Sequence, residues 1–349
     1  MRYNPLGRTD MQVSRICMGA MTFGEQNTEE EAFRMMDMCL DMGVNFFDTA
    51  EMYSFPSSPK TQGDSERAVG NWMAARGNRD KIIVATKITG PDEPGGNFSH
   101  VRGGDLNFGR KQLEDAVDQS LERLKTDYID LYQLHWSERT MNSFGKLGYE
   151  HVEDEVWTPF EDVLASLGEM MAAGKIRAIG CSNESPWGLM KMLELADRTG
   201  LPRMASIQNP YNLLNRTYEV GLSEVSIRED CGLLAYSPLA FGVLSGKYLN
   251  GAKPPKGRLT IYPQYSRYTA PGAVKATEAY VKIATEHGLD PSQMALAYVN
   301  TRRFMTSNII GATTCEQLEA NILSDNLVLT DSVLEEIEKI HTMAPNPTP

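Results

Sequence analysis

Four side chains able to hold or move a proton stand at the ends of short apolar segments of this sequence, or just beyond them. Each segment has the length and composition of a buried β-strand. The four side chains, with the segment that each follows, are Asp48 and Tyr53 (45–47), Lys87 (82–86) and His135 (131–134). A charged residue that ends a buried strand lies outside the packed layer, so these positions favour an acid–base site.

The types of these four side chains fit the reduction of a carbonyl group. A free tyrosine phenol has a pKa of about 10 and is a weak acid near neutral pH. An ammonium such as Lys87 beside Tyr53 is expected to lower that pKa, and the carboxylate of Asp48 would keep the ammonium charged and in place. His135 can donate a hydrogen bond to a carbonyl oxygen. The set could then protonate that oxygen if another group supplies a hydride.

Elements that bring these residues together can be predicted from the alternation of apolar segments and helical patterns. Eight strands are expected, at 16–18, 45–48, 82–87, 131–134, 176–181, 205–207, 232–235 and 308–310. Helices are expected at 28–41, 65–75, 110–124, 159–173, 186–199, 218–230, 273–287, 291–303, 315–323 and 331–341. Such alternation indicates a parallel sheet. Because no linker interrupts this alternation, we expect a single α/β domain that spans residues 1–349. It would be a closed (β/α)8 TIM barrel whose strand ends meet at one face.

The segments outside this pattern have separate expected roles. Residues 1–15 are expected to form a small hairpin ahead of the barrel, and residues 344–349 to be disordered. Long loops follow the third, fourth and seventh strands, at 89–109, 137–158 and 247–272. Because these loops follow strands, they should lie over the same face as the four polar side chains, and their aromatic residues favour a binding role.

Composition excludes several classes of function. The chain has 349 residues, 41% hydrophobic and 23% charged, with a net charge of -12. An acidic chain without a long basic run argues against nucleic acid or a membrane surface as a partner. The N-terminus opens no signal region, no apolar run approaches the length of a membrane span, and no cysteine pair has metal-type spacing. We expect a cytoplasmic protein without a metal; its oligomeric state is not predicted.

Competing motifs for nucleotide binding or hydrolysis are incomplete. No Gly-x-Gly-x-x-Gly opens a helix, so the Rossmann fingerprint is missing. Residues 242–248 imitate a phosphate-binding loop but are one residue short, and Tyr248 stands where a magnesium-binding hydroxyl belongs. A metal-dependent hydrolase needs several ligands at strand ends, whereas His135 is the one histidine of five at such a position.

The order and placement of Asp48, Tyr53, Lys87 and His135 resemble the catalytic tetrad of the aldo-keto reductases. Residues 43–50, Gly-Val-Asn-Phe-Phe-Asp-Thr-Ala, are similar to a signature of that superfamily. Three segments, 21–26, 144–149 and 208–216, resemble its bacterial Tas-like branch. The resemblance covers essentially the whole chain. It implies a barrel that binds NADPH or NADP+, with Tyr53 as general acid, Lys87 and Asp48 tuning it, and His135 orienting the carbonyl.

The resemblance also implies a set of cofactor-binding residues. Ser182, Asn183 and Gln208 would hold the nicotinamide carboxamide, and Tyr236 would stack on its ring. The segment from Ser237 to Lys247 would wrap the pyrophosphate, and the adenosine and its 2′-phosphate would bind near the start of a helix. The remaining expected cofactor contacts are Gly19, Met21, Asp48, Leu239, Gly242, Ser245, Arg258, Gly311, Thr313, Gln317 and Asn321.

An apolar wall for a small carbonyl substrate is expected from five aromatic residues, Phe23, Trp136, Phe144, Tyr149 and Trp157. We interpret the chain as an NADPH-dependent oxidoreductase that reduces aldehydes or ketones. The alternative from another class is a redox-sensing or interaction protein that binds NADPH with little turnover. His135 favours catalysis, since channel subunits of this fold carry Asn at that position.

Overall fold

A closed barrel of eight parallel strands forms the centre of the molecule in this computed structural model, which describes residues 1–92 and 95–348. The strands are β3 Ile16–Gly19, β4 Phe46–Asp48, β5 Ile83–Ile88, β6 Ile129–Leu134, β7 Ile176–Ser182, β8 Met204–Pro210, β9 Gly232–Tyr236 and β10 Met305–Ile310. They follow chain order around the barrel, and β10 closes it by pairing with β3, Asn308 opposite Ile16. The predicted (β/α)8 TIM barrel is confirmed.

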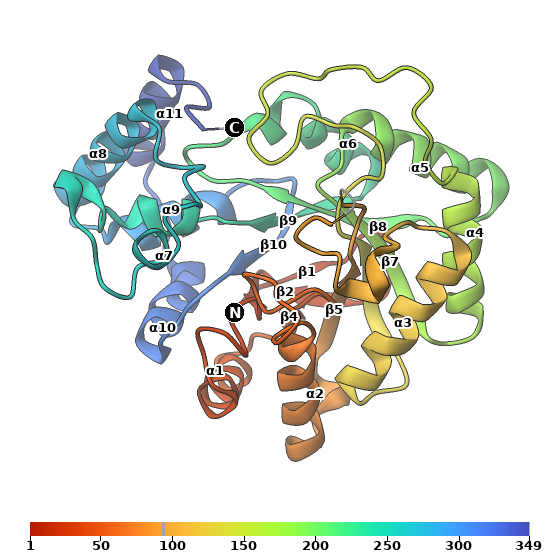
Figure 1. The fold of residues 1–349 in the computed structure, drawn as a ribbon. Helices are drawn as coiled ribbons and strands as arrows, with labels where there is room; N and C mark the ends of the chain where they lie inside the picture. The colour runs from red at the N-terminus through yellow and green to blue at the C-terminus, as the bar shows by residue number, and fades with distance from the viewer. Residues whose placement is uncertain (93–94, 349) are drawn as a thin grey trace.

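Helices surround the barrel on its outside (Figure 1). The longer ones are α1 Glu29–Asp41, α2 Asp64–Arg76, α3 Arg110–Leu124, α4 Phe160–Ala172, α5 Pro186–Thr199, α6 Leu222–Glu229, α8 Pro271–Glu286, α9 Pro291–Asn300, α10 Cys315–Leu323 and α11 Asp331–Met343. Short helices are α7 Arg258–Ile261, η1 Arg79–Lys81, η2 Val101–Gly104, η3 Thr217–Val220, η4 Ala240–Ser245, η5 Leu249–Gly251 and η6 Ser324–Asn326.

Local sequence signals account for several helix ends. Thr28 caps α1 in a capping box with Glu31, in which each side chain accepts a bond from the other residue's backbone N–H. Ser185 caps α5, which opens with Pro186. The prediction of a single helix for residues 218–230 is wrong in one respect. The segment forms two pieces, η3 and α6, because Gly221 at φ -157 and ψ -48 breaks the helical path between them.

The strands contribute to two layers of the hydrophobic core, one on each side of the sheet, because successive side chains along a strand point to opposite faces. The outer layer joins strand and helix side chains, such as Met18 and Phe47 with Trp72. The inner layer fills the barrel and contains no helix residue: it consists of Leu6, Met11, Val13, Cys17, Phe46, Ile83, Ala85, Leu131, Ala178, Ala205, Leu234 and Ile309. The barrel is therefore a packed core and not a pore.

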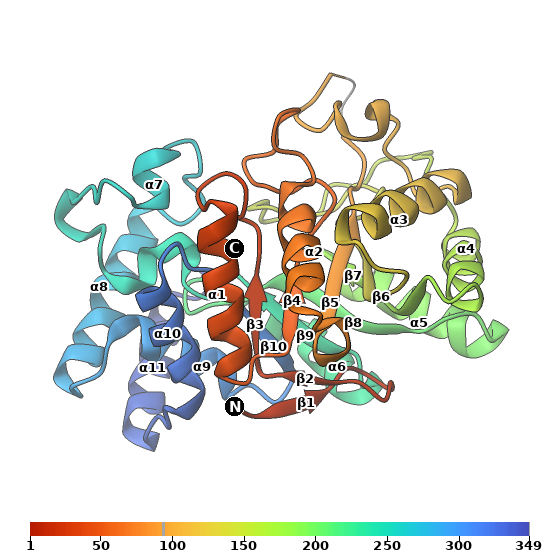
Figure 2. The same ribbon diagram turned by 90° about the horizontal axis from the view of Figure 1, so that it is seen from below.

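The predicted hairpin closes one end of this inner layer. Its strands, β1 Tyr3–Pro5 and β2 Gln12–Ser14, pair antiparallel and lie beneath the starts of the barrel strands (Figure 2). Gly7 of the turn has φ +56, and a Cβ there would stand 2.5 Å from the Ala205 carbonyl oxygen. The turn therefore requires glycine at this position, both for its backbone angle and for its approach to β8.

The three long loops follow β5, β6 and β9, as predicted. Those after β5 and β9 rise at the end of the barrel opposite the hairpin, as Figure 2 shows. The predicted irregular loop after β9 contains the short helices η4, η5 and α7, and the loop after β5 contains η2. Two residues of that loop, 93 and 94, lie outside the described part of the chain.

The C-terminal segment differs from the expectation of disorder. Residues 344–348 are described, and Thr348 is 4% exposed. The Arg216 N–H donates to the Asn346 side-chain oxygen at 2.6 Å, and the Thr348 N–H to the Leu214 carbonyl at 3.3 Å. These bonds attach the segment to the region after β8, so the prediction is wrong for residues 344–348. Residue 349 lies outside the described residues.

Replacing Leu6 by alanine tests whether the hairpin belongs to the core. Leu6 is completely buried in the inner layer, so Leu6→Ala should lower the free energy of unfolding by about 2–5 kcal/mol. Urea titration followed by circular dichroism measures this loss. Leu147→Ala, at a position 80% exposed, is the control and should change it by less than about 0.5 kcal/mol. Equal small effects would mean that the hairpin does not stabilise the barrel.

Candidate active site

The four acid–base residues predicted from the sequence meet at the carboxyl end of the barrel. The Lys87 ammonium donates to the Asp48 carboxylate at 2.6 Å and to the Thr49 carbonyl at 2.7 Å. It lies 5.0 Å from the centre of the Tyr53 ring. The Tyr53 hydroxyl is 3.4 Å from Nε2 of His135, with the two rings nearly perpendicular at 81°. The phenol therefore lies between an ammonium and an imidazole.

Strand geometry explains why Asp48 and Lys87 face each other. Phe46 and Ala85 point into the barrel as members of the inner apolar layer. Side chains two residues further along a strand point the same way, one layer higher. Asp48 and Lys87 occupy that next layer, on the adjacent strands β4 and β5. The ion pair thus directly follows the apolar filling of the barrel.

Burial dominates the acidity of the phenol. It raises the pKa of Tyr53 above its ordinary value, and the nearby Lys87 ammonium offsets only part of that effect. The sequence-based expectation that Lys87 would bring the pKa of Tyr53 below its usual value is therefore wrong. Burial also disfavours the charged form of Lys87, but Asp48 together with Tyr53 and Cys17 outweighs it, so the pKa of Lys87 is raised.

The imidazole of His135 is held in its neutral form. Burial and, secondarily, the Lys87 ammonium lower its pKa well below the ordinary histidine value. A neutral imidazole has one N–H donor and one acceptor nitrogen. With Nε2 towards the Tyr53 hydroxyl, His135 can donate to, or accept from, a group placed beside that hydroxyl.

Two amide side chains hold the remaining carboxylate oxygen of Asp48. Gln133 donates to Asp48 Oδ1 at 3.1 Å and Gln208 at 2.9 Å, and Gln208 also donates to Gln133 at 3.2 Å. Gln133 was not among the predicted site residues. Its signal is its position two residues after Leu131 of the inner layer, which places it on the inner face of β6 beside Lys87.

The residues predicted to bind a nicotinamide carboxamide form one connected group. Ser182 donates to the Gln208 carbonyl at 2.7 Å, and Asn183 donates to the His135 carbonyl at 2.9 Å. The Tyr236 hydroxyl donates to the Asn183 side-chain oxygen at 2.6 Å. The ends of β6, β7, β8 and β9 are thereby linked next to His135.

Two cations of the segment after β9 have no carboxylate partner among residues 1–92 and 95–348. The Arg258 guanidinium lies 5.4 Å above the Phe241 ring, and neither Arg258 nor Lys247 forms an ion pair there. Burial lowers the pKa of both, and Arg258 adds to the effect on Lys247. A Cβ at Gly242 would stand 2.8 Å from Nζ of Lys247. These groups form a cationic surface suited to an anion.

The other predicted cofactor residues lie on separate rim segments. Thr313 donates to the Gln317 side chain at 3.1 Å, and Asn321 donates to the Gly311 carbonyl at 3.2 Å, at the start of α10. A Cβ at Gly19 would approach Ile309 to 2.9 Å. The remaining residues form local contacts. The Met21 carbonyl accepts from the Phe55 N–H, and Leu239 packs on the core. The Ser237 carbonyl accepts from Asn212, and Ser245 donates to the Gly242 carbonyl.

The predicted aromatic wall is only partly present. The Trp136 ring lies 4.9 Å from that of His135, and Phe144 lies 6.2 Å from Trp136. Tyr149 is 59% exposed and its ring contacts His151 of its own loop. Phe23 has no exposed surface and packs in the outer core, so its prediction as a substrate contact is wrong.

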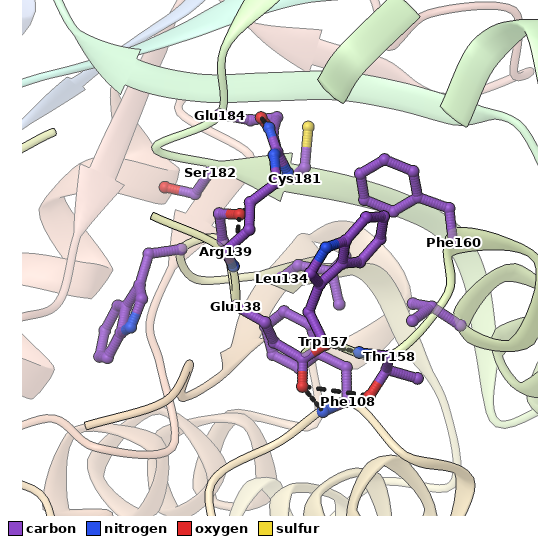
Figure 3. Close-up of a pocket in the computed structure, with 13 residues that line it drawn as sticks. Phe108, Leu134, Glu138, Arg139, Trp157, Thr158, Phe160, Cys181, Ser182 and Glu184 are labelled. Carbon is purple, nitrogen blue, oxygen red and sulfur yellow. Dashed lines mark hydrogen bonds and ion pairs between the residues drawn. The ribbon is translucent and has the colours of Figure 1, made fainter. Parts of the chain in front are cut away.

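Trp157 lines a small cavity under the loop after β6, with Phe160, Glu138 and Arg139 among its neighbours (Figure 3). The cavity volume is about 20 Å³, room for a single water molecule. The cavity is too small for an organic substrate in this structure. Within the described residues no group of three or more His, Cys, Asp or Glu side chains could hold a metal ion. No helix there is long and apolar enough to cross a membrane.

A closed parallel barrel with this acid–base group at its rim has the form of a carbonyl-reducing oxidoreductase. The chain belongs to the aldo/keto reductase family, which it matches over residues 15–342. Members of this family reduce carbonyl groups of small molecules and generally use NAD(P)H. The resemblance inferred from the tetrad is confirmed.

Individual relatives agree with this assignment. "Protein tas" of Escherichia coli (strain K12) is 48% identical over 349 residues, which covers 100% of both chains. "Uncharacterized oxidoreductase YrpG" of Bacillus subtilis is 34% identical over 344 residues, 97% of this chain and 96% of that one. An "Aldo-keto reductase" of Babesia bovis is 40% identical over 276 residues, 75% of this chain and 96% of that one. The resemblance to the Tas-like branch is confirmed as well.

The lowered pKa of His135 predicts how stability depends on pH. Below the unfolded pKa of about 6.5 the unfolded chain binds a proton that the folded site resists, so stability is present above pH 6.5 and falls as pH decreases. The loss should reach up to about 1.4 kcal/mol per pH unit. Urea titrations at pH 5 and 7.5 should show a weaker pH dependence in His135→Asn than in wild type.

His151→Asn is the matched control for this experiment, because His151 lies in an exposed loop segment with a side chain 61% exposed. It should keep the pH dependence of the wild-type protein. If His135→Asn kept it too, the imidazole would not be resisting protonation in the folded state.

Proposed function

We propose that this chain is an NADPH-dependent reductase that converts aldehydes or ketones to alcohols, with Tyr53 as the proton donor. The observation that carries the proposal is the placement of Tyr53: its hydroxyl is 3.4 Å from His135, and the Lys87 ammonium, which Asp48 holds at 2.6 Å, lies 5.0 Å from the centre of its ring. This arrangement stabilises negative charge as it develops on a carbonyl oxygen.

The residues present fit a nicotinamide dinucleotide phosphate. Lys247 and Arg258 supply cations for its phosphates, and neither has a carboxylate partner in the described part of the chain. The Asn183, Ser182 and Gln208 side chains offer amide and hydroxyl groups for its carboxamide, and Tyr236 offers an aromatic ring. When bound, this cofactor supplies the hydride.

Each residue of the tetrad then has a separate task. His135, neutral at pH 7, orients the carbonyl oxygen next to the Tyr53 hydroxyl. Tyr53 gives its proton to that oxygen as the carbonyl carbon is reduced. Lys87 stabilises the resulting phenolate, and Asp48, held by Gln133 and Gln208, keeps the ammonium charged and positioned.

Removing the phenol proton tests the catalytic assignment. Tyr53→Phe should lower kcat for aldehyde reduction by about 10²–10⁴-fold, because the general acid is lost. The ring remains packed, so NADPH binding measured by fluorescence titration should stay within about twofold of wild type.

Tyr132→Phe is the matched control, since Tyr132 is a buried tyrosine of β6 outside the tetrad and its hydroxyl has no partner among the described residues. Wild-type turnover in Tyr53→Phe would rule out the proposed acid. NADPH binding without carbonyl reduction in the wild-type protein would favour a cofactor-sensing protein instead.

Cofactor preference tests the assignment of Arg258. If its guanidinium contacts the 2′-phosphate, Arg258→Ala should weaken NADPH binding at least about tenfold and leave NADH binding nearly unchanged. Titration of both cofactors measures the difference. Arg228→Ala, at an arginine whose side chain is 72% exposed on α6, should alter neither. Equal weakening of NADPH and NADH would place Arg258 at a group that both cofactors share.

A further inference from the structure

A second buried ion pair lies next to the tetrad, in the segment that carries Tyr53. Glu51 stands two residues before Tyr53, and its carboxylate accepts from Arg102 at 3.1 Å. The side chains are 1% and 3% exposed. Separating such a pair would leave a buried charge without a partner, which is costly. The two side chains should therefore stay firmly together.

Contacts of this pair join three parts of the site. Glu51 accepts from the Thr89 N–H at 2.5 Å, and its own N–H donates to the Lys87 carbonyl at 3.2 Å. Arg102 donates to the Thr89 carbonyl at 3.1 Å and to Gln112 of α3. The pair therefore fastens the loop after β5 both to the Tyr53 segment and to the end of the strand that carries Lys87.

Arg102 adopts a backbone conformation that needs support from its surroundings. Its φ of +44 lies in the left-handed region, which side chains other than glycine rarely adopt. Residues in such conformations persist where neighbouring contacts hold them, often beside functional sites. On either side, Val101 and Leu106 pack against Ala50 and Met52 in a small apolar cluster, so ion pair and apolar contacts fix the loop together.

The fastened loop supports the ring nearest to His135. Phe98 of the loop lies 5.3 Å from Trp136, whose indole N–H donates to the Pro91 carbonyl at 2.9 Å. Trp136 in turn lies 4.9 Å from His135. A chain of contacts thus runs from the Glu51–Arg102 ion pair through the loop to the aromatic ring beside the imidazole.

We propose that the Glu51–Arg102 ion pair is a positioning element that determines which carbonyl compounds the site accepts. The proposal rests on the function proposed above. By fixing Phe98 and Trp136, the pair provides a rigid wall for a flat, bulky apolar group attached to the carbonyl, such as an aromatic ring. A small aliphatic aldehyde needs the tetrad alone and is indifferent to the wall.

The chain offers a matched control for removing Arg102. The Arg123–Glu66 pair is also buried, with side chains 11% and 0% exposed and a 2.5 Å contact. It joins α3 to α2, and Glu66 also accepts from Thr86. Within the described residues, neither Arg123 nor Glu66 forms a hydrogen bond or ion pair with the loop after β5. Arg102→Gln and Arg123→Gln therefore remove the same charge from the same kind of environment, and only the first should release the loop.

Hydrogen exchange followed by mass spectrometry tests the structural part without any substrate. Amides of residues 95–109 should exchange at least about tenfold faster in Arg102→Gln than in wild type. In Arg123→Gln their exchange rates should equal those of wild type. Steady-state kinetics test the specificity part. KM for an aromatic aldehyde should rise about tenfold in Arg102→Gln, with kcat for propanal within about twofold of wild type. Arg123→Gln should leave the ratio of kcat/KM for the two aldehydes unchanged.

Several outcomes would overturn the proposal. The first is an unchanged rate of hydrogen exchange at the loop amides in Arg102→Gln. The second is an equal loss of kcat/KM for both aldehydes in that variant. The third is the same change in selectivity in Arg123→Gln. If Arg102→Gln fails to fold, Glu51→Gln/Arg102→Gln removes both charges and takes its place, with the same expected results. A wild-type protein that reduces neither aldehyde would contradict the proposed function and the role in selectivity, while loop exchange would still report whether the pair holds the loop.

Discussion

The ion pair between Asp48 and Lys87 is the constraint on which the rest of the site depends. Moving a carboxylate and an ammonium out of water costs several kcal/mol for each ion, which only close geometry and further hydrogen bonds can offset. Here the offset comes from Thr49, Gln133 and Gln208, on three different segments. The pair is satisfied only when β4, β5, β6 and β8 are all in place, so the site assembles only together with most of the barrel.

Much of this site could be predicted because strand ends are visible in sequence. Apolar segments of strand length mark where a polar residue must leave the packed layer, and parallel topology brings those ends to one rim. That argument was sufficient to place Asp48 next to Lys87. It missed Gln133, which lies inside a strand. A glutamine there is recognised as part of the site only when the face of β6 that points into the barrel is known.

Other differences between prediction and structure depend on tertiary burial, which cannot be derived from the sequence alone. The pKa of Tyr53 depends on how completely the phenol is buried, and burial outweighs the neighbouring ammonium. Phe23 follows a rim strand, but its loop folds it back into the outer core. The C-terminal segment has a composition typical of disorder, yet Thr348 finds a partner after β8. Each of these outcomes depends on tertiary contacts between distant segments.

The seam between β3 and β10 has a consequence for synthesis of the chain. Ile16 of one strand lies opposite Asn308 of the other, so the long stretch of chain between these residues must leave the ribosome before the sheet can close. At roughly 5–20 residues per second, translation keeps one sheet edge open for on the order of 15–60 s. An open strand edge is a template for pairing with other chains. The nascent protein therefore passes through a period of exposure to aggregation that ends only when β10 arrives.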